Sequence, residues 1–393
     1  MGHGEKPGGA VLLEIAGLCL RLGFTAFGGP AAHIAMLQDE VVDRRKWMTR
    51  DEFLDLLGLS NLIPGPTSTQ TVINCGRVRG GFPGLCVAGV CFILPAALIT
   101  GVIAWAYVRF GSLPEAGPIL YGVKPAVVAI IFVAVAHLAR QAAKAWQLVI
   151  VGIGVLASYL MGVNPILGLL AGAVIGMLWL RMTPRSGKIA APAVLLAAIA
   201  TTKSALAAGS ASAAAKAVPL WKLGVFFLKI AFVLFGGGYI LVAFLHGGLV
   251  VDNKWLTQEQ LLDAIAVGQF TPGPVFSAAT FIGYVIDGVP GAAVATLGIF
   301  LPSFLLIAAL SPLLPRMRKS PWTGAFLDAV NMSAVGLMAA VTIGLAVHAL
   351  TRWPAWVIFA LATICTLRFK VNTAWIVLGG ALLGLAAHAC RLL

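Results

Sequence analysis

The sequence is short of charge, and the charge it has is unevenly divided by sign. Only 10% of its 393 residues are charged, and 14 acidic residues stand against 27 basic ones. A soluble globular protein carries roughly 25% charged residues, so this chain cannot cover a water-facing surface in the usual way. Hydrophobic residues reach 60%, and many apolar runs approach the ~20 residues that a membrane helix needs. The composition predicts a multi-pass membrane protein with the lipid bilayer as its surroundings.

Several missing motifs exclude further classes of function. The basic excess is expected for cytoplasmic loops, so no nucleic-acid partner is predicted. The six cysteines form no Cys-x-x-Cys pair, and the six histidines show no ligand spacing, so no metal site or cofactor is expected. There is no phosphate-binding loop, metalloprotease helix or Gly-x-Ser-x-Gly elbow, which argues against an ATPase or another enzyme. The first ten residues lack a signal-peptide pattern, so we expect no cleaved leader.

An internal repeat organises the chain. Leu20, Phe24 and Phe27 recur 208 residues later, and the same offset places one Pro-Gly-Pro, residues 64–66, on another at 272–274. After one deleted residue the offset becomes 207. The repeat predicts an N-terminal domain at 1–181, a cytoplasmic linker at 182–219 and a C-terminal domain at 220–393. Whether the Ala-rich stretch 189–208 adds a crossing stays open, with a non-spanning connector favoured.

Each half shows the same order of predicted elements. A first apolar helix, 11–37 or 220–245, is followed by a loop with a tryptophan and then by the Pro-Gly-Pro segment, 53–75 or 261–284. The remaining predicted helices are 84–108, 119–138, 146–162 and 165–181 in the first half, and 291–314, 326–348, 353–367 and 373–389 in the second. The predicted fold is an all-α polytopic membrane protein with about five spanning helices per half.

Charge placement favours a re-entrant Pro-Gly-Pro segment. If the segment enters and leaves on one side as two half-helices, each half crosses five times and the halves form an inverted repeat. That arrangement puts 19 of the 27 basic residues on one face, as the positive-inside rule expects for the cytoplasm. A segment that crossed once would split the first-half positives about evenly. The re-entrant arrangement places both chain ends outside the cytoplasm.

Broken helices of paired repeats commonly form the substrate site of secondary transporters. Two repeat-related cations inside apolar helices, Arg21 and Lys229, are the sharpest candidates, because a charge at that depth costs a few kcal/mol or more. Snorkelling, or pairing with Glu14, is the alternative for Arg21. The other predicted substrate-binding residues are Gly28, Gly29, Asn61, Pro64, Gly65, Pro66, Thr67, Lys124, Gly236, Gly237, Gln269, Pro272, Gly273 and Pro274. Helix packing explains the Gly-Gly pairs equally well, and back-bonding to helical carbonyls explains the nearby hydroxyls.

These motifs together resemble one family. Phe-Gly-Gly-Pro at 27–30, the basic tryptophan loop, Asn-x-x-Pro-Gly-Pro-Thr at 61–67 and the Pro-Gly-Leu…Phe-Ile-Leu-Pro run at 83–95 are similar to the chromate ion transporter family in its long, two-domain form. Short members are single halves that work as pairs, which leaves a homodimer open. The second half departs from the pattern with Gly238 for Pro30 and Val275 for Thr67.

The resemblance implies gradient-driven export of chromate from the bacterial cytoplasm across the inner membrane, giving chromate resistance. The residues themselves indicate only a carrier suited to an oxyanion. Sulfate, another tetrahedral dianion, moved in either direction, remains an alternative substrate. An anion channel is a second alternative.

Overall fold

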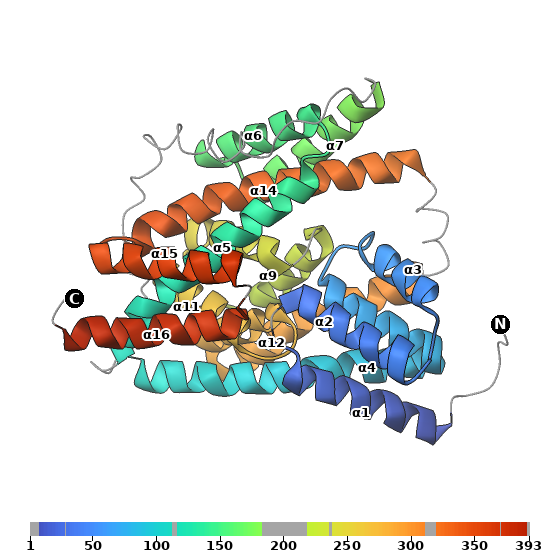
Figure 1. Ribbon diagram of the computed structural model, residues 1–393. Helices are drawn as coiled ribbons and strands as arrows, with labels where there is room; N and C mark the ends of the chain where they lie inside the picture. Colours follow the sequence, from blue (N-terminus) through green and yellow to red (C-terminus); the bar gives the residue numbers. More distant parts are fainter. Residues whose placement is uncertain are drawn as a thin grey trace. The chain divides into compact units, whose positions relative to one another are not determined.

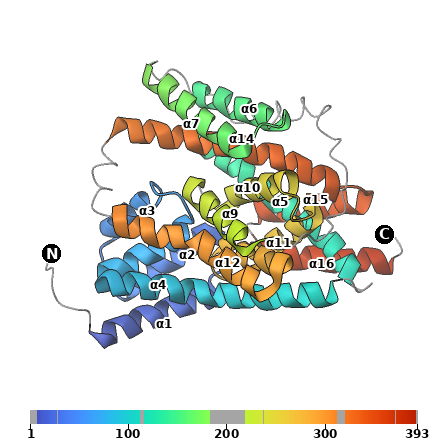
Figure 2. The same cartoon turned by 180° about the vertical axis from the view of Figure 1, so that it is seen from behind.

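A computed structural model describes residues 8–27, 29–111, 116–182, 218–235, 238–310, 320–369 and 371–390. All regular elements in these ranges are helices (Figures 1 and 2). The chain divides into two compact units. Unit 1 comprises Met1–Arg109, Val218–Gly238 and Val267–Met317, and unit 2 comprises Phe110–Ala217, Tyr239–Ala266 and Arg318–Leu393. Each unit therefore combines segments of both sequence repeats.

Five described helices are long and apolar enough to cross a membrane. They are Thr67–Phe110, Ala116–Ala142, Pro165–Met182, Val275–Leu310 and Pro321–Ala349. Shorter apolar helices are Trp146–Leu160, Leu241–Asp252, Trp353–Arg368 and Thr373–Ala389. Residues 183–217, which include 189–208 and nearly all of the linker, lie outside the described residues.

The predicted first helix of each half is not continuous, so that prediction is wrong. In the first repeat, α1 (Gly9–Thr25) ends at an extended Ala26, and α2 (Gly29–Gln38) begins anew. In the second, α9 (Leu220–Val233) ends at an extended Leu234, followed by η2 (Gly238–Ile240) and α10 (Leu241–Leu245). Pro30 explains part of the first break, because proline has no amide proton and fits only the opening turn of a helix.

The Pro-Gly-Pro segment of the first repeat forms a helical hairpin. Helix α3 (Arg50–Ser60) leads to the break, and α4 (Thr67–Phe110) leaves it and then kinks at Gly80 and Gly81. The two arms are tied by a hydrogen bond of 3.1 Å from Asn74 Nδ2 to Ser60 Oγ. At 1.5 Å per residue, α3 is about 16 Å long and the α4 arm before the kink about 20 Å. Neither arm alone reaches the ~30 Å of a hydrocarbon core.

The hairpin returns to the place where it begins. Trp47 lies just ahead of α3, and the Arg79 guanidinium at the far end of the second arm lies 5.7 Å from the centre of its ring. Beyond Gly81, which has a φ of +60°, the rest of α4 doubles back along the second arm. Gly76 and Gly84 meet there with no room for a Cβ on either.

The second repeat contains the same succession of elements. Helix α11 (Gln258–Phe270) precedes the break, and a 3₁₀ turn, η4 (Val275–Ser277), then opens α12 (Ala278–Leu310). Helix α12 kinks at Asp287 and Gly288, the latter with a φ of +57°. The helix–break–helix pattern predicted for both Pro-Gly-Pro segments is thus present in both repeats.

The tryptophan loops also repeat in detail. Each follows a π-helix, η1 (Asp39–Arg44) or η3 (His246–Asp252), and each contains a lysine with positive φ, +52° at Lys46 and +54° at Lys254. The next helices begin with capping boxes, Thr49–Glu52 and Thr257–Gln260. Two copies of so unusual a backbone support the duplication read from the sequence.

Unit 2 is built around two long helices, α5 (Ala116–Ala142) and α14 (Pro321–Ala349). Helices α15 (Trp353–Arg368) and α16 (Thr373–Ala389) pack against α5, whereas α6 (Trp146–Leu160) and α7 (Pro165–Met182) pack against α14 (Figure 1). Glycines allow close backbone contact between these helices, at Gly122 with Gly380 and Gly384, and at Gly152 with Gly336. Small residues permit such backbone contact between membrane helices.

This packing predicts a sharp contrast between two adjacent glycines of α16. A Cβ at Gly380 would lie 2.7 Å from the Gly122 carbonyl oxygen, whereas a Cβ at Gly379 meets nothing within 4 Å. We expect Gly380→Ala to lower the unfolding free energy by about 1–3 kcal/mol, since overpacking forces the helices apart. Gly379→Ala should be nearly neutral. Thermal unfolding of the purified proteins in detergent checks this, and equal melting temperatures for the two variants would contradict it.

Candidate functional site

The two broken regions of one repeat are joined to those of the other by reciprocal hydrogen bonds within unit 1. The Gly65 amide donates to the Leu234 carbonyl at 2.6 Å, and the Gly273 amide donates to the Ala26 carbonyl at 2.9 Å. Donors and acceptors are repeat partners, each 208 residues apart. The last carbonyls of a helix have no partner inside it, so α1 and α9 each end on an acceptor that the opposite break satisfies.

These bonds limit which amides remain for a ligand. Within each Pro-Gly-Pro only the glycine has an amide proton, and the opposite repeat already takes it. The glycine amides of the two Pro-Gly-Pro breaks are therefore not free to hold an anion in this conformation. The donors that remain after the first break belong to the opening turn of α4, Thr67 to Thr69, whose amides lack intrahelical acceptors.

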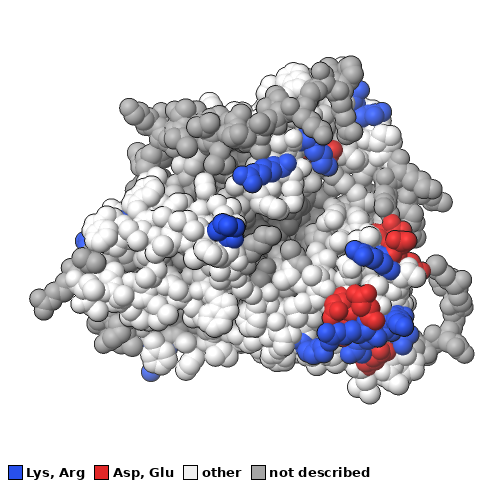
Figure 3. Space-filling model, viewed as in Figure 1, with Lys and Arg blue, Asp and Glu red and all other residues white. Residues whose placement is uncertain are grey.

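Arg21 belongs to a cluster of charges on unit 1. It forms an ion pair with Glu40, and Arg44 and Arg45 also contact that carboxylate. Glu14, which the sequence offered as its partner, instead accepts hydrogen bonds from Arg45, Trp47 and Arg79. Acidic and basic side chains gather over α1, α2 and α4 in Figure 3, on a face that is otherwise mostly uncharged.

The charges of this cluster are strongly coupled. Only 6% of the Glu40 side chain is exposed, against 50% of Arg21. Burial would raise the pKa of Glu40, but hydrogen bonds from Arg21 and Arg45 outweigh it and lower that pKa. Glu40 therefore stays ionised and Arg21 remains paired in this conformation.

The other predicted cations have different surroundings. Lys229 is exposed on α9 and makes no ion pair with any described residue. Like Arg21, it lies five residues before the carbonyl that receives the opposite break, which is about 7.5 Å along a helix. Lys124 belongs to unit 2, where it pairs with Glu259 at 3.3 Å. The structure thus brings Arg21 and Lys229 into one unit and leaves Lys124 out of it.

The remaining predicted residues divide by burial. Asn61 is exposed at the end of α3, whereas its repeat partner Gln269 is buried, and neither amide atom of Gln269 has a hydrogen-bond partner among the described residues. Gly29 opens α2 with a φ of +78°. Pro64, Gly65, Pro66, Thr67, Pro272, Gly273 and Pro274 form the breaks themselves. Gly28, Gly236 and Gly237 lie outside the described residues.

Sequence reasoning did not identify Ser303, which the structure places at the first break. A Cβ on Gly65 would lie 2.7 Å from Gln70 Nε2 and 3.1 Å from Ser303 Oγ. The polar flank containing Gln70 was visible in the sequence, but Ser303 lies some 240 residues away on α12. The available signal was that Ser303 stands where the first repeat has Ala96.

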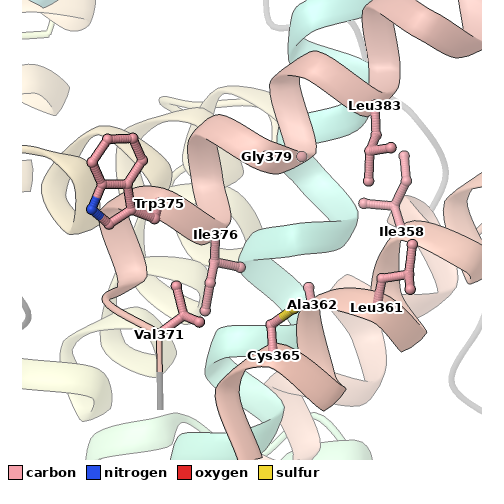
Figure 4. Close-up of a pocket in the computed structure, with 10 residues that line it drawn as sticks. Ile358, Leu361, Ala362, Cys365, Val371, Trp375, Ile376, Gly379 and Leu383 are labelled. Carbon is pink, nitrogen blue, oxygen red and sulfur yellow. The ribbon is translucent and has the colours of Figure 1, made fainter. Parts of the chain in front are cut away.

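An apolar hollow in unit 2 does not suit an anion. It lies between α15 and α16 and is lined by side chains such as Ile358, Cys365, Trp375 and Leu383, with no charged residue (Figure 4). An ion transferred there would lose its hydration without compensation.

Long apolar helices and a duplicated set of broken helices are typical of a multi-pass membrane protein of the transporter class. The family model of the chromate transporter matches residues 13–177 and 221–385, once for each repeat. The chain therefore belongs to the chromate transporter family and is a multi-pass protein of the inner membrane.

Individual relatives agree with this assignment. The chromate transport protein of Cupriavidus metallidurans is 34% identical over 380 residues, covering 94% of this chain and 91% of the relative. The probable chromate transport protein of Synechococcus elongatus is 31% identical over 365 residues, covering 90% and 89%. An uncharacterised transporter of Bacillus subtilis is 30% identical over 154 residues, which is 38% of this chain and 86% of the relative. No solved structure matches the chain significantly.

Proposed function

We propose that this protein exports chromate from the cytoplasm as a gradient-driven secondary transporter and so confers chromate resistance. The reciprocal hydrogen bonds between the breaks, Gly65 to Leu234 and Gly273 to Ala26, are the observation that carries the proposal. They join broken helices of both repeats in one compact unit, the arrangement that secondary transporters use for their substrate site. Membership of the chromate transporter family supports chromate as the substrate.

The two repeats are inverted relative to each other in this proposal. Reciprocal contacts are what a pseudo-twofold axis produces, and the skew of basic residues supports an axis in the membrane plane. The contact between Arg79 and Trp47 supports a Pro-Gly-Pro hairpin that returns to its own side of the membrane. Re-entrant backbone is tolerated at membrane depth where it is buried in protein or lines a cavity, and the breaks at Gly65 and Gly273 are buried.

Arg21 and Lys229 supply the positive potential for the dianion. Both lie one to two turns from a break, on helices whose last carbonyls hold the opposite repeat. Arg21 shares Glu40 with Arg44 and Arg45, so Glu40 keeps two cations when Arg21 turns to the anion. The first-turn amides of α4 add donors at the positive end of a helix dipole.

Flux into inverted membrane vesicles tests the function. In such vesicles the cytoplasmic face points outward, so an exporter carries labelled chromate inward. We expect saturable uptake that stops when ionophores dissipate the driving gradient, and none above background in vesicles without the protein. Parallel measurements with labelled sulfate and with sulfate as competitor identify the preferred anion.

Other outcomes of the flux measurement would contradict the proposed substrate, direction or mechanism. Uptake of sulfate but not chromate would assign another oxyanion, and uptake only into right-side-out vesicles would reverse the direction. Flux that rises with concentration without saturation would indicate an anion channel.

A further inference from the structure

The two Pro-Gly-Pro breaks are related by the repeat, but their glycines have chemically different neighbours. At the first break the atoms facing Gly65 are polar, Gln70 Nε2 and Ser303 Oγ. At the second break a Cβ added to Gly273 would instead meet the Ala96 methyl group at 2.8 Å and the backbone of Gly23. Ala96 and Ser303 are repeat partners at an offset of 207, and Gln70 stands where the second repeat has Ala278, so a hydroxyl and a carboxamide distinguish the two breaks.

The polar groups at the first break are buried and incompletely hydrogen-bonded. Ser303, Gln70 and Thr69 all have no exposed surface. Ser303 Oγ, Thr69 Oγ1 and Gln70 Oε1 have no hydrogen-bond partner among the described residues. Gln70 Nε2 donates to the Pro64 carbonyl at 2.6 Å, which fixes the orientation of the carboxamide and leaves one of its two N–H groups.

A buried hydroxyl without a hydrogen-bond partner lowers stability, so an alanine at position 303 would serve packing better. Alanine fills that position in the first repeat, at Ala96. Packing of the fold therefore does not explain the Ser303 hydroxyl. Ser303 Oγ–H, Thr69 Oγ1–H, the second N–H of Gln70 and the opening amides of α4 are all donors near one helix N-terminus, and several oxygens of a tetrahedral oxyanion need such donors.

We propose that the oxyanion is bound at the first break only, by Ser303, Gln70 and the first turn of α4, and that the second break is a structural joint packed by Ala96. This inference rests on the proposed transport of an oxyanion and assigns it to one of two repeat-related positions. The second break opens into the 3₁₀ turn η4, in which the Ser277 amide already donates to the Pro274 carbonyl at 2.9 Å, so the second break offers one first-turn amide fewer than α4. Gln269 lies one turn before the second break and not at its glycine.

Moving the hydroxyl from one break to the other tests the proposal. Ser303→Ala, Ala96→Ser and the double variant are purified, and two quantities are measured. These are the half-saturating concentration of labelled chromate in inverted vesicles, and the rise in melting temperature that added chromate or sulfate produces in detergent. We expect Ser303→Ala to raise the half-saturating concentration about tenfold, equivalent to about 1.4 kcal/mol, and to reduce the anion-induced rise. Its melting temperature without anion should be equal to or above that of the unchanged protein.

The control and the double variant separate this idea from a symmetric site. Ala96→Ser alone should leave affinity unchanged, and Ser303→Ala with Ala96→Ser should bind as weakly as Ser303→Ala. Restored affinity in the double variant would overturn the proposal, because both breaks would then bind. Normal affinity in Ser303→Ala would also overturn it. If the unchanged protein transports no chromate, the proposed function fails, and the anion-induced rise with sulfate still reports on the subsite.

Discussion

Replacing Gly273 by alanine should abolish transport and destabilise unit 1 by several kcal/mol. Gly273 has a φ of +85°, where an L-residue costs roughly 1–2 kcal/mol. A Cβ would also lie 2.8 Å from the Ala96 methyl group and 3.1 Å from the Gly23 carbonyl oxygen. Relieving that overlap would pull the Gly273 amide from Ala26 and so separate the two repeats. Gly65→Ala should behave similarly, because its φ is +123° and its neighbours are equally close.

Gly162 provides the matched control for backbone strain. Its φ is +86°, nearly that of Gly273, but a Cβ there meets nothing within 4 Å. Gly162→Ala should therefore cost only the roughly 1–2 kcal/mol of left-handed strain and retain chromate flux. Melting temperatures in detergent and flux in vesicles compare the three variants. Equal losses for Gly162→Ala and Gly273→Ala would show that φ alone matters and that the cross-repeat contact does not.

Neutralising Arg21 or Lys229 should reduce chromate flux by more than tenfold without loss of membrane insertion. In the proposed function either cation would lower the cost of bringing a dianion to membrane depth, where an unbalanced charge costs several kcal/mol. Arg21→Gln leaves Glu40 with Arg44 and Arg45, so the local fold should persist. The measurements are vesicle flux, chromate resistance of intact cells and the amount of protein in the membrane.

Lys222 serves as the control on the same helix as Lys229. It lies two turns earlier, beside the Trp221 ring, and is exposed. Lys222→Gln should leave flux and resistance unchanged, and Lys229→Arg should retain most of both. Full chromate resistance in cells with Arg21→Ala would contradict the proposed role of Arg21 in binding the anion.

The partner of Arg21 shows where sequence reasoning reached its limit. If residues 11–37 formed one continuous helix that ran on to Glu40, Arg21 and Glu40 would lie about 28 Å apart, at 1.5 Å per residue. Glu14, two turns away on the same face, was then the natural acidic partner. The break at Ala26 and Phe27 allows the chain to change direction, and Glu40 meets Arg21 instead. An apolar run with a Gly-Gly pair does not by itself reveal such a break, because membrane helices tolerate glycine.

The features that could be predicted from the sequence were those set by a residue's own backbone or by the repeat. Exact recurrence of Pro-Gly-Pro at a fixed offset revealed the duplication and both hairpin breaks, since proline and glycine act on their own backbone. Ser303 could not be assigned to Gly65, because their proximity depends on how α12 packs against the other repeat. The division into units that each mix both repeats also depends on tertiary packing.

The inverted arrangement of the repeats is tested most directly by thiol labelling at four repeat-related positions. Asp43 and Val251 precede the two tryptophan loops, and Phe82 and Val289 follow the two helix kinks, all four being exposed. Each is changed to cysteine in a background without the six native cysteines that still transports chromate. A membrane-impermeant thiol reagent is then applied to inverted and to right-side-out vesicles.

We expect Asp43→Cys and Phe82→Cys to react only in inverted vesicles, and Val251→Cys and Val289→Cys only in right-side-out vesicles. Labelling of Asp43→Cys and Phe82→Cys from one side reports a hairpin that returns to its own side. Labelling of the second pair from the other side reports inversion. Reaction of all four from the same side would contradict the inverted repeat, and reaction of Asp43→Cys and Phe82→Cys from opposite sides would contradict the re-entrant hairpin.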